Sequence, residues 1–263
     1  MITVILVIYK TDKKLLNDFF KKINNKYKVI IIDNSLNYNF KDISLPKTHK
    51  ILRSKNRGNG SGINFGLKYT NTKYAIYFDT DTYFHKDFIS KFFNIAKKIK
   101  NFCMLVPNHG NIVSKNNYVE KYTGEASIMF FNVKKLKKLG NFDENFFLYF
   151  EESDLMLRCK RKKEKIYFIK NLKIKHKRAS SISKKINISH LREWHYMWSM
   201  FYFYKKNYSY FFAVKKTYHF ILKDLFVIVI SILFLNYKTI RLRFFRLFGI
   251  ISSMLGLNSF LRP

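Results

Sequence analysis

The chain has 263 residues, of which 48% are hydrophobic, and this content predicts a folded α/β domain of about 180 residues with a smaller appendage. Fifty Lys and Arg against seventeen Asp and Glu give a formal net charge of +33, so we expect a polyanionic neighbour. The two cysteines, Cys103 and Cys159, lack the spacing of a disulfide framework or a zinc site, which indicates a reducing compartment.

The chain begins with alternating apolar and amphipathic segments. We expect strands at Thr3–Tyr9 and Lys28–Ile32, because β-branched runs bounded by polar residues are typical of the interior of a parallel sheet. Between them, Lys13–Ile23 has the apolar spacing of a helix. The run Met1–Tyr9 lacks a basic leader and a small-residue cleavage site, so we interpret it as a buried strand and not as a signal peptide.

A strand near Lys50–Arg53, a helix over about Ile63–Tyr69 and a strand at Tyr74–Phe78 continue this alternation. The sequence therefore predicts an α/β fold with a Rossmann-like, doubly wound and mainly parallel sheet. Ligands of such sheets bind at the carboxyl ends of the strands. Three polar residues stand at these ends: Tyr9, Asp33 and Asp79.

Two acids follow the strand at Tyr74–Phe78. Asp79 and Asp81 are two positions apart, and in an extended chain their side chains would point to the same side, about 6.6 Å apart. Carboxylates at this spacing can hold a hard divalent cation that also binds a diphosphate, and Mg²⁺ or Mn²⁺ is the expected ion. The alternative is a turn with solvated aspartates.

A glycine-rich segment precedes the same strand. Asn56-Arg-Gly-Asn-Gly-Ser-Gly-Ile-Asn-Phe-Gly66 holds four of the nine glycines. Glycine allows backbone amides to approach a ligand closely. The segment has neither the Gly-Lys-Ser/Thr of a P-loop nor the spacing of a dinucleotide fingerprint. It predicts either a ligand-binding loop of another kind or an ordinary glycine loop.

Acids are scarce, yet five of them fall within twelve residues: Asp143, Glu144, Glu151, Glu152 and Asp154. Acids at the start of a helix are favoured by its dipole, which is the simplest explanation. However, the aromatic run just before them indicates an apolar pocket, where the pKa of a carboxylate rises toward that of a useful base. On a helix, Glu151 and Asp154 share a face, whereas Glu152 points about 100° away.

The C-terminal part is strongly basic. From Lys165 to Pro263, nineteen Lys and Arg stand against only Glu193 and Asp224, and aromatic residues are interleaved with them. The uncharged runs Leu225–Tyr237 and Leu247–Leu261 are shorter than the 18 or so residues that span a bilayer. We expect helices that lie in the interface of an anionic membrane. The alternative is a helical hairpin packed on the preceding domain.

The order of these motifs resembles that of the family-2 inverting glycosyltransferases with the GT-A fold, and in particular their rhamnosyltransferase-like branch. The resemblance covers about residues 1–185, and residues 186–263 would form the helical, membrane-associating extension. It rests on five features: the opening strand with Tyr9, the Asp33-Asn-Ser turn, the loop Asn56–Gly66, the Asp79-Thr-Asp81 motif, and Phe142–Arg158, which has the pattern F-D-E-x-F-F-x-Y-x-E-E-x-D-x-x-x-R.

The resemblance implies roles for the matching residues. Asp33 would accept hydrogen bonds from the nucleotide base, and Asp81 with Asp79 would hold the metal. His176 would complete the metal coordination, unless it is a surface residue of the basic run. The residues implied to bind the donor are Tyr9, Asp33, Asn56, Gly58, Gly62, Asn64 and Asp79.

The resemblance also implies a catalytic base. Glu152 stands where the family has the Asp of its Glu-Asp pair, and it would deprotonate the acceptor hydroxyl. Asp154 is the second candidate, and Glu151 would lie on the acceptor side.

The expected function is transfer of a hexose or deoxyhexose, such as rhamnose, from a nucleotide-sugar donor to a cell-surface polysaccharide or lipid-linked glycan. The enzyme would be cytoplasmic and peripherally attached to the inner face of the cell membrane. A nucleic-acid-binding protein is an alternative that explains the charge, but its carboxylates would repel phosphates, so we expect no nucleic acid. An inactive membrane scaffold is a further alternative, and Asp79, Asp81 and Glu152 argue against it.

Overall fold

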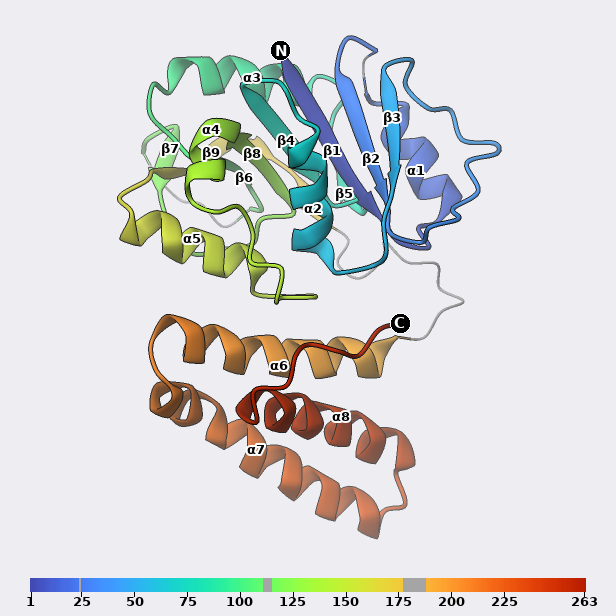
Figure 1. The fold of residues 1–263 in the computed structure, drawn as a ribbon, viewed down its shortest axis with the longest axis vertical. Coiled ribbons are helices and arrows are strands. Elements are labelled where there is room, and N and C mark those ends of the chain that lie inside the picture. The colour runs from blue at the N-terminus through green and yellow to red at the C-terminus, as the bar shows by residue number, and fades with distance from the viewer. Residues whose placement is uncertain (24, 111–114, 177–187) are drawn as a thin grey trace. The chain divides into compact units, whose positions relative to one another are not determined.

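The computed structural model describes residues 1–23, 25–110, 115–176 and 188–263. The chain divides into two compact units (Figure 1). The sheet unit comprises Met1–Phe142 and Leu155–Ile186, and the helical unit comprises Asp143–Asp154 and Asn187–Pro263. The acidic segment therefore belongs to the same unit as the C-terminal helices.

The sheet unit contains one large sheet. Its strands are β1 (Ile2–Ile8), β2 (Lys28–Asp33), β3 (His49–Arg53), β4 (Tyr74–Phe78), β6 (Met104–Asn108), β7 (Tyr118–Glu120), β8 (Ile128–Asn132) and β9 (Ile166–Lys173). Their order is β3-β2-β1-β4-β8-β6-β9-β7. The first four strands in this order are parallel, β8 is antiparallel to β4 and β6, and β9 is parallel to β6 and antiparallel to β7. The predicted α/β class with a mainly parallel sheet is confirmed.

Helices cover both faces of this sheet. They are α1 (Lys13–Phe20), α2 (Asn59–Lys68), α3 (Phe88–Lys98), α4 (Val133–Lys138) and the second part of α5 (Glu151–Arg161). Alternate residues of β1 enter different cores, because successive side chains of a strand point to opposite faces. Leu6 packs in the core that receives Phe19 of α1 and Phe92 of α3, whereas Ile5 packs with Ile63 of α2. Burial on both faces explains the continuous apolar runs of the parallel strands.

Helix α2 begins earlier than the sequence predicted. It starts at Asn59 and not near Ile63, so most of the glycine-rich segment is helical. A Cβ atom at Gly62 would lie 2.7 Å from Val7 Cγ1, and one at Gly66 would lie 2.8 Å from Ile5 Cγ2. These glycines allow α2 to pack closely on β1, and only the residues before Asn59 remain as a loop.

The helical unit contains α6 (Ser189–Asn207), α7 (Tyr210–Leu233) and α8 (Tyr237–Met254). Its core is a cluster of buried side chains from all three helices: Met197, Met200, Phe201, Ala213 and Ile250. A Cβ atom at Gly249 would lie 2.3 Å from the Trp194 carbonyl oxygen, so this glycine is required where α8 crosses α6. Among the described residues, none of the helices combines the length and the apolar character needed to cross a bilayer.

Ion pairs around a buried carboxylate connect the three C-terminal helices. Asp224 of α7 is fully buried and accepts hydrogen bonds from Arg243 Nη1 and Arg246 Nε of α8, both at 2.8 Å. Arg246 also donates to Glu193 of α6. A buried carboxylate requires such partners, since an unpaired charge would be costly to desolvate.

Candidate active site

A tight turn follows β4 and carries both acids of the Asp79-Thr-Asp81 motif. The Asp79 amide donates to the Ser127 carbonyl oxygen at 2.7 Å, and the Thr82 amide donates to the Asp79 carbonyl oxygen at 3.2 Å. The prediction that both acids lie in an extended chain is therefore wrong, because the chain turns between Asp79 and Thr82. The turn leads directly into β5 (Thr82–Tyr83).

A second, two-stranded sheet brings His176 to this turn. The short strand β10 (Lys175–His176) is antiparallel to β5, and His176 pairs with Thr82. His176 Nε2 consequently lies 3.0 Å from Asp81 Oδ1 and 3.8 Å from Asp79 Oδ2. His176 is the last residue of this short strand.

These three side chains form a group that could hold a metal ion. One ligand atom each from Asp79, Asp81 and His176 lies within 4.8 Å of the others. Asp81 is buried, while Asp79 and His176 are partly exposed, so the group is accessible. Two carboxylates and one imidazole suit a divalent cation, and the carboxylate oxygens favour Mg²⁺ or Mn²⁺. The donor set therefore fits the predicted ion.

Two residues that the sequence did not single out lie beside this group. Glu125 Oε1 lies 2.6 Å from His176 Nδ1 and 3.8 Å from His109 Nδ1. Glu125 lies three residues before the start of β8, which runs antiparallel to β4 with Ile128 paired to Phe78. Residues before β8 must therefore lie near residues after β4. The sequence signal that could have identified Glu125 is an acid, in a chain with few acids, shortly before a buried apolar strand.

The neighbours of His176 determine its charge. Burial lowers the pKa of His176, but hydrogen bonds to Asp81 and Glu125 and the charge of Asp79 raise it, to about 9 overall. The imidazole is therefore protonated at neutral pH, and its positive charge lies between the carboxylates where a cation could bind. A metal ion would have to displace this proton, because only the neutral imidazole is a ligand.

The predicted donor-binding residues at the strand ends lie along one edge of the sheet. Tyr9 follows β1 and Asp33 ends β2, and these parallel strands pair through Ile8 and Asp33. The Asp33 carboxylate is fully buried and accepts hydrogen bonds from the amides of Ser35, at 2.8 Å, and Tyr38, at 2.9 Å. Asp79 follows β4, which is the other neighbour of β1. The fold therefore places all three residues on the same edge.

The other predicted donor residues lie in or just before α2. Asn56 Oδ1 accepts from the Gly58 amide at 3.2 Å, and Gly58 has a φ of 102° that favours glycine. Asn64 forms two hydrogen bonds with the backbone of Phe142, at 2.9 and 3.0 Å. Asn64 thus anchors the last residue before the acidic segment, and Gly62 packs on β1, so close packing accounts for both residues.

Hydrogen bonds connect α2 to the turn that carries Asp79. The Tyr77 hydroxyl donates to Asp79 Oδ1 and also lies 2.8 Å from Asn59 Oδ1. Asn59 is the first residue of α2. The position of α2 on the sheet therefore influences the position of the Asp79 carboxylate.

The acidic segment is part of the helical unit. Tyr149 and Phe150 both have positive φ values, 70° and 67°, which is a strained conformation for bulky residues. This turn leads into the first turn of α5. Glu151 and Asp154 are buried there, while Glu152 is partly exposed, which matches the faces predicted from helical spacing.

Asp154 has close polar partners within the helical unit. Its Oδ1 accepts from Lys206 Nζ at 2.7 Å and from Asn207 Nδ2 at 3.1 Å. Lys206 Nζ also lies 2.7 Å from Asp143 Oδ2. The structure therefore places Asp154 in a polar cluster with α6, and Glu152 on a different face of α5.

Several solved structures have a similar fold. GalNAc-T7 with UDP, GalNAc and Mn²⁺ has a TM-score of 0.58 and 13% identity over 78% of this chain, which spans about half (49%) of that chain. The mannosyltransferase PcManGT from Pyrobaculum calidifontis, in complex with GDP-Man and Mn²⁺, has a TM-score of 0.57 and 10% identity over 97% of this chain and 87% of its own. S. aureus TarS has a TM-score of 0.52 and 15% identity, and the match covers 75% of this chain and 38% of that chain. A comparison with curated proteins found no significant match.

The fold is therefore that of the GT-A type of glycosyltransferase, with a possible metal-binding group at the end of β4. Residues 3–165 match the family described as Glycosyl transferase family 2. This match covers more than half of the chain, and the chain belongs to that family.

Proposed function

We propose that the protein transfers a sugar from a nucleoside-diphosphate-sugar to a hydroxyl group of a glycan acceptor. The observation that carries this proposal is the Asp79, Asp81 and His176 group at the carboxyl end of β4, in a chain of glycosyltransferase family 2. Two structures with a similar fold contain Mn²⁺ together with UDP or GDP-Man, which supports the same class of donor here. Bound Mg²⁺ or Mn²⁺ would neutralise the diphosphate as it leaves.

The strand edge would bind the nucleoside part of the donor. Asp33 and Tyr9 lie at the ends of neighbouring parallel strands, which is where such sheets bind ligands. Asp79 would contact the ribose or the sugar, because it follows the next strand of the same edge. Asn56 and Gly58 would line the donor from the loop before α2.

Glu152 is our candidate for the catalytic base. It would remove the proton of the acceptor hydroxyl while that oxygen attacks the anomeric carbon on the side opposite the diphosphate, so the reaction would invert the configuration. One base is sufficient for this direct displacement. The partial exposure of Glu152 supports this choice over Asp154, which is fully buried against Lys206 and Asn207. Glu151 would support the acceptor side.

The acceptor we propose is a cell-surface polysaccharide or a lipid-linked glycan, and the sugar a hexose or a deoxyhexose such as rhamnose. The enzyme would act at the cytoplasmic face of the cell membrane. The basic helical unit supports this location, because Lys and Arg beside exposed apolar side chains favour an anionic membrane surface.

A donor screen tests the proposal. Thermal unfolding of the protein would be measured with a panel of nucleotide-sugars, each with Mg²⁺, with Mn²⁺ and with a chelator. A true donor should raise the melting temperature only with metal, because a ligand at 100 times its Kd stabilises the folded state by about 2.7 kcal/mol. The donor found would then be tested for transfer to glycan acceptors. Stabilisation by none of the nucleotide-sugars under any condition would reject the proposed donor class.

A further inference from the structure

Exposed apolar side chains are concentrated at the turn between α7 and α8. Nine of the large apolar side chains that face solvent lie within residues 225–237, which we call the hairpin tip. The described part of the sheet unit, although larger, exposes five. Phe226, Leu233 and Phe234 of the tip are 67%, 72% and 78% exposed. Contiguous exposure of this kind marks a surface that contacts another apolar phase.

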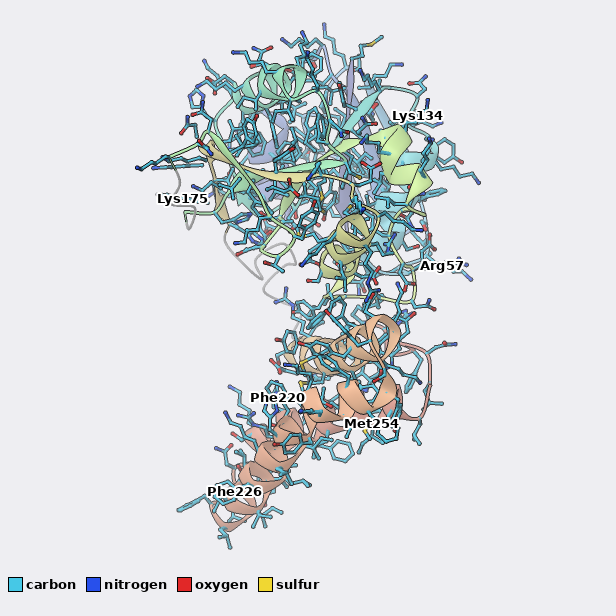
Figure 2. The ribbon with its side chains drawn as sticks, turned by 90° about the vertical axis from the view of Figure 1, so that its left-hand side faces the viewer. Arg57, Lys134, Lys175, Phe220, Phe226 and Met254 are labelled. Atoms are coloured by element: carbon cyan, nitrogen blue, oxygen red, sulfur yellow. The ribbon has the colours of Figure 1, made fainter. Side chains whose placement is uncertain are left out.

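The tip extends beyond the core of its own unit. The core side chains of α7 come from its first half, between Ala213 and Ile221. Beyond the buried Asp224, α7 contributes no residue to that core. Figure 2 shows Phe220 near the body of the unit and Phe226 farther along α7 toward its free end. The exposed apolar surface is therefore a projection and not a groove.

The charges around the tip have one sign. Asp224 is the only acid in residues 210–254, and it is fully buried against Arg243 and Arg246. Lys223, Lys238 and Arg241 are exposed and flank the tip. An apolar projection with a basic border complements an anionic lipid surface, where basic residues contact headgroups and apolar residues enter the acyl region.

The length of the tip matches half a bilayer. Leu225–Leu233 are nine helical residues, which at about 1.5 Å per residue extend roughly 13 Å. The hydrocarbon core of a bilayer is about 30 Å thick, so one leaflet provides about 15 Å. The tip can therefore enter one leaflet but cannot cross both.

We propose that the hairpin tip inserts end-on into one leaflet of an anionic phospholipid bilayer, with Lys223 at the headgroups and the long side chains of Lys238 and Arg241 extending back toward them from the start of α8. This inference deepens the membrane attachment proposed above, because it assigns that attachment to one surface and one orientation. It differs from the sequence-based expectation of helices that lie flat in the interface. It requires neither donor nor metal, so it can fail independently of the proposed transferase activity.

Vesicle binding of the full-length chain is the first test. Affinity would be measured by cosedimentation with vesicles of phosphatidylcholine, with and without phosphatidylglycerol. Leu233→Ser/Phe234→Ser should weaken binding by on the order of 10²-fold, because two large apolar side chains no longer enter the bilayer. The control Phe211→Ser/Leu255→Ser removes side chains that are 84% and 71% exposed but lie outside the tip, and it should bind normally. Far-UV circular dichroism would verify that both variants fold.

The basic border is tested separately. Lys238→Gln/Arg241→Gln should weaken binding to phosphatidylglycerol vesicles by about fivefold for each residue, and this difference should disappear at high salt. Binding to pure phosphatidylcholine should be unchanged by these substitutions. Equal loss on both kinds of vesicle would contradict the role of the basic residues as headgroup contacts.

Insertion depth decides the orientation. Cys103 and Cys159 are fully buried, so a thiol-reactive fluorescent label attaches to the folded Phe234→Cys variant only at position 234. Lipids with a spin label deep in the acyl chain should quench the fluorescent label on Phe234→Cys more strongly than a fluorescent label on Lys216→Cys. Equal quenching at both positions, or equal vesicle binding by the tip variant and its control, would overturn the proposal. A dimer without lipid that Leu233→Ser/Phe234→Ser dissociates would instead assign the tip to a second copy of the chain.

Discussion

Lys206 Nζ lies 2.7 Å from Asp154 Oδ1 and thereby joins the last turn of α6 to the first turn of α5. The Asp154 carboxylate is fully buried, whereas the Lys206 side chain is 28% exposed. The same ammonium group contacts Asp143, so one lysine holds both ends of the acidic segment. The position of Glu152, which lies between these ends, therefore depends on Lys206.

Lys206→Met should lower the free energy of unfolding by about 1–3 kcal/mol, because the buried Asp154 loses its cationic partner. Urea denaturation measures this change. Lys215→Met on exposed α7 surface is the control, and we expect its effect to stay within about 0.5 kcal/mol. If the two variants are equally stable, the ion pair contributes little to the helical unit.

Asp81→Ala should abolish metal-dependent donor binding, because the diphosphate charge must be neutralised in the site. Calorimetric titration of the nucleotide with Mg²⁺, and again with a chelator, measures this. Asp87→Ala is the matched control, since Asp87 is a partly exposed acid paired with Lys91 at 2.6 Å, outside the metal group. Equal nucleotide affinity in Asp81→Ala, with and without chelator, would contradict the metal assignment.

Metal binding should depend on pH through His176. Because the pKa of His176 is raised to about 9 without metal, each ion bound at lower pH displaces one proton. The affinity for Mg²⁺ should therefore rise by about tenfold per pH unit up to about pH 9 and then level off. His176→Gln should bind more weakly and without this slope. The same slope in both proteins would show that the titrating group is another residue.

His176 also affects the stability of the metal-free protein. Its folded pKa lies above the unfolded value of about 6.5, so its contribution is fully present below about pH 6.5 and is lost as pH rises through about 9. Urea denaturation across this range should show a decline that is smaller in His176→Gln. This measurement needs neither donor nor acceptor.

Glu152→Gln should retain donor affinity but lower turnover by about 10² to 10⁴, the usual contribution of a general base. Glu152→Asp should keep part of the activity, because the carboxylate is preserved. Glu144→Gln removes a nearby acid outside α5 and serves as the control. Normal turnover in Glu152→Gln, together with an inactive Asp154→Asn that still binds donor, would assign the base to Asp154.

The local patterns predicted the elements of the sheet unit from β1 to β4. The runs that became β1, β2 and β4 are dominated by apolar residues, so both their type and their burial followed from the sequence. Tyr9, Asp33 and Asp79 could be placed at one edge because parallel strands align their carboxyl ends. Only the start of α2, from Asn59 to Gly62, was wrongly predicted as a loop, since glycine lowers helix propensity and the close packing of α2 on β1 compensates for it.

Contacts between distant segments could not be predicted. Asp81 and His176 are 95 residues apart and meet only because two very short strands pair. The sequence offered both residues as ligands by resemblance, but it gave no reason for their proximity and did not single out Glu125. In the same way, the spacing of Cys103 and Cys159 predicts no contact, whereas the fold brings the two thiols together, and this contact and burial raise the pKa of Cys103.

Gly62 and Gly66 limit how this protein could be engineered. Replacing helical glycines by alanine commonly stabilises a protein, because alanine reduces the freedom of the unfolded chain. At these two positions the added methyl group would collide with Val7 or Ile5 and move α2 away from the sheet. Asn59 at the start of α2 would move with it, and through Tyr77 so would the carboxylate of Asp79. Substitutions intended to raise thermostability should therefore avoid α2, even though its glycine content makes it the obvious first helix to change.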